Sequence, residues 1–154
     1  MIDTESPAEK AAEEAKMKEM ASQLPTLQAA MATTLADAKA GKLGASTTMT
    51  KGGVKVITLT KGTGAAMQTG ETAKVNYIGT LLDGTKFDDS FSRGATLDFP
   101  VGVGRMIPGF DEAVGTMTHG TKAVIVVPSA LGYGDQANGP IPAKSDLAFY
   151  IELL

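Results

Sequence analysis

The sequence changes character at Gly41, and this change constrains the fold more than any other feature. All 18 glycines of the 154-residue chain lie at or after this position, whereas Ala, Glu, Lys and Met dominate before it. After it, Val, Ile, Thr and Phe alternate with polar residues between glycine-containing turns. Alternation with a period of two is typical of strands, and Ala- and Glu-rich stretches are typical of helices. The sequence therefore predicts a helical extension or linker over residues 1–44 and a sheet-rich domain over residues 45–154.

The helical segment carries a narrow apolar stripe. Its residues recur at seven-residue intervals or fill the alternate positions: Met17, Leu24, Met31 and Ala38, with Met20, Leu27 and Thr34 or Leu35. Such a stripe favours pairing with another helix, as in a homodimer or a tether, and suits equally a helix that packs loosely on its own domain or acts as a spacer. Pro25 predicts a kink or a break into two helices. Residues Ala45–Thr50 are expected to form a short polar linker.

The second part of the chain predicts an α+β fold. Alternating apolar residues indicate five to six strands, at Val54–Leu59, Val75–Gly79, around Phe87, at Leu97–Phe99, at Ala123–Val127 and at Leu147–Leu153. Asp83-Gly84 is a strong hairpin signal before Phe87. Pro108–Gly115 reads as a short helix that begins with proline and ends with glycine. The simplest arrangement is an antiparallel sheet curled over that helix.

Composition excludes several classes of function. The net charge of -3 provides no basic field for nucleic acid. Cysteine is absent, and the only histidine, His119, is expected in a solvated turn, so no metal site or catalytic triad is indicated. No stretch approaches the length of a membrane span. A cysteine-free chain of this kind suits a periplasmic or a cytoplasmic setting equally.

A long apolar loop separates the last two predicted strands. Roughly 17 residues between Pro128 and Asp146 show no periodic pattern, and loops of this length are usually functional or disordered. The segment contains Leu131, Tyr133, Ile141 and three prolines. An apolar loop stiffened by proline favours the rim of a pocket.

Reactive side chains are few, and the notable set is apolar and aromatic. Its members are Tyr77, Phe87, Leu97, Phe99, Met106, Ile107, Phe110, Tyr133, Ile141 and Phe149. The polar candidates beside them are Asp88, Arg93 and the hydroxyl groups of Tyr77 and Tyr133. A concave apolar surface with a few polar groups is typical of a binding pocket. Gly102-Val103-Gly104 is a lone GxG that is better explained as a turn than as a dinucleotide motif.

Five segments in order resemble the FKBP-type peptidyl-prolyl cis/trans isomerase family. The first two are Val75–Thr80 and Leu82–Ser90, the third is Met106–Ala113, and the last two are Val126–Gly134 and Ile141–Leu154. The likeness extends from about Thr48 to the final residue. The helical extension is similar to that of bacterial members that dimerise and act as chaperones.

The resemblance implies a fold and an activity. The family fold is a half-open antiparallel sheet wrapped around one short helix. The activity is rotation about the bond preceding proline, whose barrier is about 18–20 kcal/mol. This reaction needs no cofactor, metal or covalent step. Proline-containing segments of unfolded or folding proteins are the implied partners.

The resemblance also assigns roles to particular residues. It implies that Phe110 floors the pocket and that four side chains wall it: Tyr77, Phe87, Leu97 and Phe149. Phe149 would suit a role in the core alone equally well. Met106, Ile141 and Ile107 would meet the substrate, with the Ile107 N–H as a donor. Asp88 would be a buried acceptor held by Tyr77 and Arg93. The alternative for Asp88 is an acid that only stabilises a turn or caps a helix. The Tyr133 hydroxyl would bind a substrate carbonyl.

Two positions depart from the family pattern. Phe110 occupies a position that is often tryptophan, and Leu97 one that is often aromatic. Both changes remove apolar area, at about 25 cal/mol per Å², and predict weak binding of the macrolides tacrolimus and rapamycin. An alternative to the enzyme is a non-catalytic peptide-binding or chaperone module of the same fold. The chain is also compatible with being the C-terminal part of a longer protein.

Overall fold

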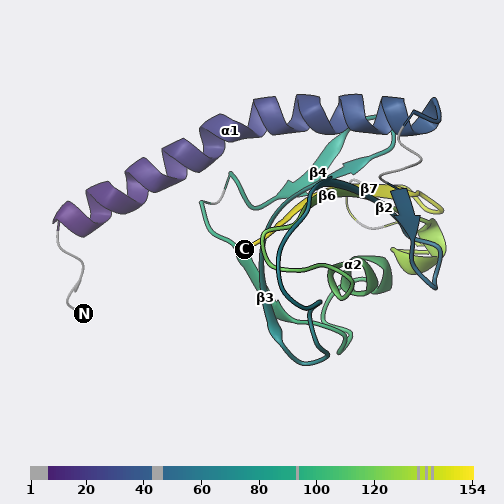
Figure 1. Cartoon of the computed structure of the whole chain (residues 1–154). Coiled ribbons are helices and arrows are strands. Elements are labelled where there is room, and N and C mark those ends of the chain that lie inside the picture. Colours follow the sequence, from purple (N-terminus) through teal and green to yellow (C-terminus); the bar gives the residue numbers. More distant parts are fainter. Residues whose placement is uncertain (1–6, 43–46, 93, 135, 138, 140) are drawn as a thin grey trace.

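An antiparallel sheet of seven strands forms the scaffold of the residues that this computed structural model describes, namely 7–42, 47–92, 94–134, 136–137, 139 and 141–154. The elements in chain order are α1 (Pro7–Lys39), β1 (Thr47–Met49), β2 (Lys55–Thr60), β3 (Thr72–Leu81), β4 (Lys86–Asp89), β5 (Leu97–Pro100), α2 (Pro108–Val114), β6 (Lys122–Val127), a 3-10 turn (Ser129–Leu131) and β7 (Leu147–Leu153). The strands lie in the order β1-β2-β6-β7-β3-β4, and β5 also pairs with β3 (Figure 1). The predicted α+β class is confirmed.

The short helix α2 fills the concave side of the sheet (Figure 1). Phe110, Ala113 and Val114 of this helix are fully buried in the main core. Pro108 begins the helix, where its missing N–H costs nothing. The helix is too short to be stable alone, so packing against the strands must hold it. The predicted sheet wrapped around one short helix is therefore confirmed.

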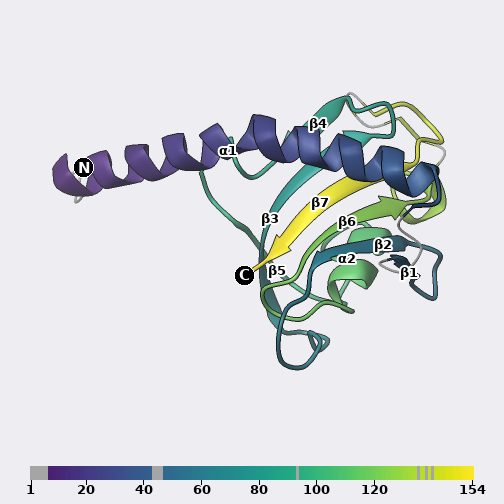
Figure 2. The same cartoon turned by 45° about the horizontal axis from the view of Figure 1, so that its top comes forward.

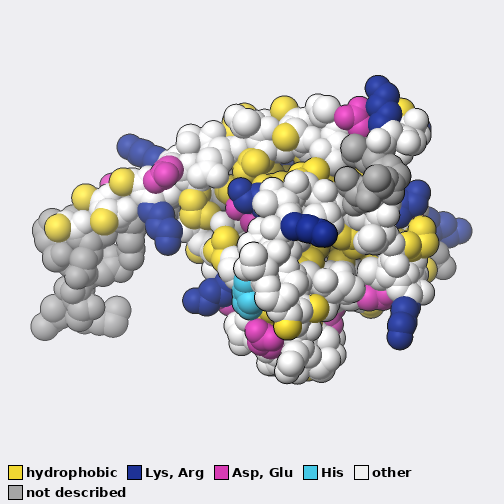
Figure 3. Space-filling model, viewed as in Figure 1, with side chains coloured by type: hydrophobic (Ala, Val, Ile, Leu, Met, Phe, Trp, Pro, Cys, Tyr) yellow, Lys and Arg dark blue, Asp and Glu magenta, His cyan; other side chains and the backbone are white. Residues whose placement is uncertain are grey.

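The long helix α1 covers the opposite, outer face of the sheet. Figure 2 shows it lying across β3, β7 and β6. Met31 is 1% exposed and packs with Ile57, Ile78 and Tyr150 in a second core. Figure 3 shows hydrophobic side chains gathered along the line where the helix meets the sheet. No helix of the described residues combines the length and hydropathy that a membrane span requires.

Burial on two faces explains the sequence of the central strands. Phe149 and Ile151 of β7 face the main core, while Ala148 and Tyr150 face α1. All four are buried. A strand covered on both sides reads as a nearly continuous apolar run, as Leu147–Ile151 does. The outer face of this sheet is thus apolar and is covered by α1.

Two expectations about the connection between the parts need correction or refinement. Thr47–Met49, expected as polar linker, form β1, which pairs with β2; two threonines in three residues suit an exposed edge strand. Pro25 lies inside one continuous helix. The ribbon of α1 changes direction near its middle (Figures 1 and 2), so the helix is kinked and not broken. Leu24 and Leu27, which are partly buried against the second core, support the helix across the proline.

The turn between β3 and β4 is the hairpin that the sequence predicts. Gly84 has a φ of 95°, which favours glycine. The Leu81 N–H donates to the Thr85 carbonyl at 2.9 Å, and the Thr85 N–H donates to Asp83 Oδ1 at 2.8 Å. This turn returns the chain along β3 and carries Phe87 and the acids that follow it to the edge of the concave side.

The packing of α1 on the sheet can be tested with two methionines. We expect Met31→Ala to lower the free energy of unfolding by about 2–5 kcal/mol, because it leaves a cavity between helix and sheet. Met49 is 63% exposed, so Met49→Ala should change it by less than about 0.5 kcal/mol. Urea unfolding of both variants gives the measurement. Equal, small effects would mean that α1 does not pack on the sheet in solution.

Candidate active site

Phe110 is the centre of an aromatic cluster on the concave side of the sheet. Its ring centroid lies 6.0 Å from that of Tyr77, 5.7 Å from that of Phe99 and 5.1 Å from that of Phe149. The contacts with Tyr77 and Phe149 are edge-to-face, an arrangement that aromatic quadrupoles favour. One side chain of α2 is thereby fixed against β3, β5 and β7 together.

Half-buried apolar side chains extend this cluster toward solvent. Phe87 of β4 packs edge-to-face on Phe149, with centroids 5.6 Å apart. Leu97, Met106 and Ile107 pack against the same core while keeping part of their surface exposed. An accessible apolar surface over a buried aromatic floor suits an apolar ligand group.

Gly79 allows two of these rings to approach the backbone of β3. A Cβ atom at this position would lie 2.8 Å from Phe87 Cε1 and 2.9 Å from Phe149 Cε1. Any larger residue would displace both rings. Glycine is therefore required here by the packing of Phe87 and Phe149 on β3, and not by a turn.

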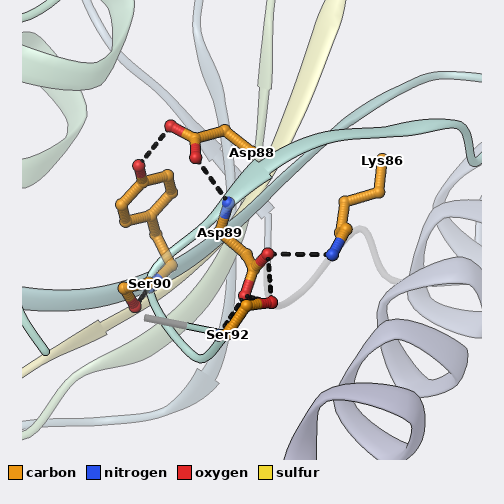
Figure 4. Close-up of polar contacts among 6 residues, drawn as sticks. Lys86, Asp88, Asp89, Ser90 and Ser92 are labelled. Atoms are coloured by element: carbon orange, nitrogen blue, oxygen red, sulfur yellow. Dashed lines mark hydrogen bonds and ion pairs between the residues drawn. The ribbon is translucent and has the colours of Figure 1, made fainter. Parts of the chain in front are cut away.

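Asp88 meets the aromatic cluster at its open edge. The Tyr77 hydroxyl donates to Asp88 Oδ2 at 2.5 Å, and the Asp89 N–H donates to Asp88 Oδ1 at 2.9 Å (Figure 4). The contact between Asp88 and Tyr77 that the family resemblance implies is present in the structure. The prediction that Asp88 is buried is wrong: the residue is exposed, because β4 is a short strand at the edge of the sheet.

The next carboxylate, Asp89, points the other way and was missed from the sequence. Figure 4 shows it turned toward Lys86 and Ser92. Its Oδ1 accepts a hydrogen bond from Lys86 Nζ at 2.9 Å, and its Oδ2 accepts one from the Ser92 N–H at 2.6 Å. Burial opposes ionisation, but these hydrogen bonds outweigh it and lower the pKa of Asp89. Strand alternation was the available signal, since adjacent residues face opposite sides.

Ser90 fixes the backbone of the tyrosine and was also missed. Its hydroxyl accepts from the Tyr77 N–H at 2.9 Å and donates to Asn76 Oδ1 at 3.2 Å. Its own N–H donates to the Tyr77 carbonyl at 2.9 Å. Because Ser90 is fully buried, these bonds are shielded from water and hold Tyr77 in place.

Asp111 anchors the loop that leads to α2. Its Oδ1 accepts from the Gly102 N–H at 2.6 Å and its Oδ2 from the Gly104 N–H at 3.2 Å. Both glycines have a φ of 79°, which confirms that the GxG is a turn. The anchored loop continues directly into Met106 and Ile107. This role of Asp111 was missed from the sequence.

Ile107 presents a backbone donor beside the cluster. It is the N-cap residue of α2, and its carbonyl accepts from the Asp111 N–H at 3.1 Å. The predicted position of this donor next to Phe110 is consistent with its place at the start of the helix.

The loop after β6 contributes one exposed and one buried candidate. Tyr133 is 37% exposed, whereas Ile141 is 3% exposed and belongs to the main core. Little of Ile141 is thus open to a ligand. The loop is held at its ends by a hydrogen bond of 2.9 Å from the Ser129 N–H to Asp146 Oδ1. Arg93, the remaining candidate, lies outside the described residues.

The described residues offer no cluster of three or more His, Cys, Asp or Glu side chains that could hold a metal ion. His119 lies in a turn at the surface, with its Nδ1 2.8 Å from the Leu154 carbonyl and its Nε2 3.5 Å from Glu71 Oε2. The contact with this carbonyl, aided by Glu71, raises the pKa of His119. The expected turn histidine is confirmed.

Comparison with known proteins agrees with this geometry. The family described as "FKBP-type peptidyl-prolyl cis-trans isomerase" matches residues 63–154. "FK506-binding protein 2" of Debaryomyces hansenii is 46% identical over 85 residues, which are 55% of this chain and 63% of that protein. "FKBP-type peptidyl-prolyl cis-trans isomerase FkpA" of Aeromonas hydrophila is 46% identical over 93 residues, 60% of this chain and 34% of that protein. The chain thus spans less than two thirds of these curated relatives.

A solved structure shares the fold. The crystal structure of AtFKBP13 superposes with a TM-score of 0.64 at 32% sequence identity, covering 70% of this chain and 95% of that one. The family match begins in the loop before β3 and continues through β7. It includes the strands and the helix α2 that carry the aromatic cluster, but not β1 and β2. The chain belongs to the FKBP-type peptidyl-prolyl cis/trans isomerase family.

Proposed function

We propose that residues 45–154 form an isomerase domain that accelerates rotation about X-Pro bonds and so assists protein folding. The observation that carries this proposal is the Tyr77–Asp88 hydrogen bond at the open edge of the cluster around Phe110. It combines an apolar surface for a proline ring with a fixed polar group at its border. Family membership supports the same activity.

The proposed reaction depends on the polarity of the site and not on reactive side chains. Resonance gives the peptide bond its double-bond character and a polar carbonyl. An apolar site disfavours that charge-separated form and accepts the twisted one, which lowers the barrier. Uncatalysed exchange takes tens to hundreds of seconds. Millisecond turnover therefore requires a gain of roughly 10⁴–10⁵, or about 5.5–7 kcal/mol.

Each part of the site would contribute to that gain. Phe110 and the rings around it would receive the proline side chain. The Ile107 N–H would hold a substrate carbonyl, and the Tyr133 hydroxyl a second one. The Asp88 carboxylate, oriented by Tyr77, would face the carbonyl that twists. Fixed dipoles of this kind act without reorganising during the reaction.

Phe110 and Leu97 also bear on ligand preference. We propose that the domain binds macrolides of the tacrolimus and rapamycin type weakly, because these two side chains offer less apolar area than larger aromatic residues would. Loss of about 40 Å² would weaken binding by about 1 kcal/mol, at about 25 cal/mol per Å².

The second candidate is a peptide-binding or chaperone module with little turnover. The exposure of Asp88 favours it, because a solvated carboxylate stabilises a twisting amide less than a buried one does. Both candidates use the same surface and the same proline-containing segments. They differ in whether exchange is accelerated.

The projecting end of α1 supports a proposal about assembly. The described side chains from Ala8 to Glu19 are all exposed, and this end extends beyond the sheet (Figure 1). We propose that it pairs with a second copy of the chain. The other role that an exposed helix end suits is that of a spacer.

The isomerase proposal is tested by NMR exchange spectroscopy on a series of short X-Pro peptides. We expect wild type to accelerate exchange, Asp88→Ala to reduce kcat/KM by about tenfold, or about 1.4 kcal/mol, and Phe110→Leu to reduce it further. Asp98, an exposed acid on β5, provides the control: Asp98→Ala should leave the rate within twofold. Folded wild type that accelerates no peptide would exclude the enzyme and leave the binding module.

The anchoring role of Asp111 can be tested separately. Asp111→Asn keeps one acceptor and loses the charge, so we expect the amide signals of Gly102 and Gly104 to shift and kcat/KM to fall by about tenfold, or about 1.4 kcal/mol. Glu112 is the neighbouring acid, which is half-buried and accepts a hydrogen bond from the Gly52 N–H at 2.6 Å. Glu112→Gln should change neither. Equal effects of both substitutions would argue against a specific role of the loop.

Assembly through α1 is tested by analytical ultracentrifugation of the full chain and of a variant lacking residues 1–19. The deleted part makes no described contribution to either core, so the variant should stay folded. We expect a dimer for the full chain and a monomer for the variant. A monomeric full chain at all concentrations would assign the helix end to a spacer.

A further inference from the structure

The strand β4 contains a β-bulge at the edge of the candidate active site. On β3, the neighbours Gly79 and Thr80 pair with Asp88 and Lys86 respectively, so Phe87 is the extra residue between the two pairs. Two consecutive residues of β4, Phe87 and Asp88, thus lie opposite the single residue Gly79. This count of two against one defines a bulge, a feature that is frequent beside active sites because it redirects a side chain.

The bulge directs two consecutive side chains to the concave side of the sheet. In a regular strand, consecutive side chains point to opposite faces. Here the Phe87 ring packs on that of Phe149 with centroids 5.6 Å apart, and Asp88 accepts a hydrogen bond from the Tyr77 hydroxyl at 2.5 Å. Phe149 and Tyr77 both belong to the main core. A regular β4 would therefore present only one of these two side chains to the site.

An ion pair on the outer face of the sheet spans the bulge. Lys86 Nζ lies 2.9 Å from Asp89 Oδ1. The two residues are three apart, and residues three apart in a regular strand point to opposite faces. The bulge brings both to one face, and the ion pair holds the bulge in return. Figure 4 shows Asp89 turned toward Lys86, with the Asp88 carboxylate directed away from both.

The surroundings of Asp89 make this contact stronger than an ordinary surface ion pair. The side chain of Asp89 is 5% exposed and that of Lys86 is 32% exposed, so water and salt screen their attraction less than at an open surface. Ser92 fixes the same carboxylate through its N–H at 2.6 Å and its hydroxyl at 2.8 Å. Phe91, buried in the second core, anchors the chain between them. Loss of Lys86 would leave a nearly buried carboxylate without its counter-charge.

We propose that Lys86 and Asp89 are positioning residues of the candidate site. Their ion pair keeps β4 bulged, and the bulge keeps Phe87 and Asp88 turned together toward a bound proline-containing segment. Both residues act from the outer face and touch no substrate. The effect on catalysis rests on the proposed isomerase function, whereas the effect on the orientation of Phe87 does not.

The orientation is tested by NMR, through nuclear Overhauser contacts between the rings of Phe87 and Phe149. We expect these contacts in wild type and their loss in Lys86→Met, which removes the charge and keeps the length of the side chain. Lys86→Arg keeps the charge and should preserve them. Lys74→Met, at an exposed position of β3, is the matched control and should also preserve them. Contacts that are absent from wild type, or that persist in folded Lys86→Met, would overturn the proposal.

The effect on catalysis is tested with the X-Pro peptides by exchange spectroscopy. We expect Lys86→Met to lower kcat/KM about fivefold, and Lys86→Arg and Lys74→Met to stay within about twofold of wild type. Because the ion pair acts partly through Asp88, the loss in a double variant with Asp88→Ala should be smaller than the product of the single losses. A full product, or an unchanged rate in Lys86→Met, would refute the positioning role.

Asp89→Asn keeps the test decisive if Lys86→Met does not fold. It retains an acceptor for Ser92 and removes the ion pair, so the same loss of contacts between Phe87 and Phe149 is expected. Folded Asp89→Asn with unchanged ring contacts would contradict the proposal. A wild type that accelerates no peptide would refute the proposed isomerase function instead, and the ring contacts would then decide alone whether the ion pair holds the bulge.

Discussion

Burial of the central strands on both faces is the constraint on which the rest of this structure depends. β3, β6 and β7 present one apolar row to α2 and another to α1. A sheet with two apolar faces is stable in water only when both are covered. α2 is too short to fold alone and α1 contains an internal proline, so each helix depends on the sheet that it covers. The two cores are thus parts of one cooperative unit.

The candidate site follows from the inner core and not from added reactive groups. Phe110 contacts rings on three strands, and the same packing leaves Phe87, Leu97, Met106 and Ile107 partly open. The polar parts are held by short local bonds: Ser90 fixes Tyr77, and Asp111 fixes the loop before Ile107. A chain with one histidine and no cysteine can therefore build an apolar surface of the kind that the proposed rotation about X-Pro bonds requires.

Much of the fold could be predicted from the sequence, and the reasons for the misses are physical. Alternation identified six strands, Asp83-Gly84 identified the hairpin, and Pro108 marked the helix. β1 was missed because a strand of three residues is too short to carry a periodic signal. The exposure of Asp88 depends on the place of β4 at the edge of the sheet, which local sequence does not encode, whereas the opposite orientation of Asp89 follows from strand alternation. The stripe on α1 was recognised, but the strands that it covers are spread along the chain, and the last of them, β7, lies over a hundred residues away, so sequence alone left its packing open.

That separation has a consequence for how the protein is made. α1 leaves the ribosome before any strand that it covers, and β7, the strand at the middle of its footprint, is synthesised last of all the elements. At about 5–20 residues per second, the interval between them is on the order of 5–20 s. During that time the apolar stripe of the helix has no sheet to cover. A nascent chain of this protein thus presents, for several seconds, the kind of exposed hydrophobic segment that cellular chaperones recognise.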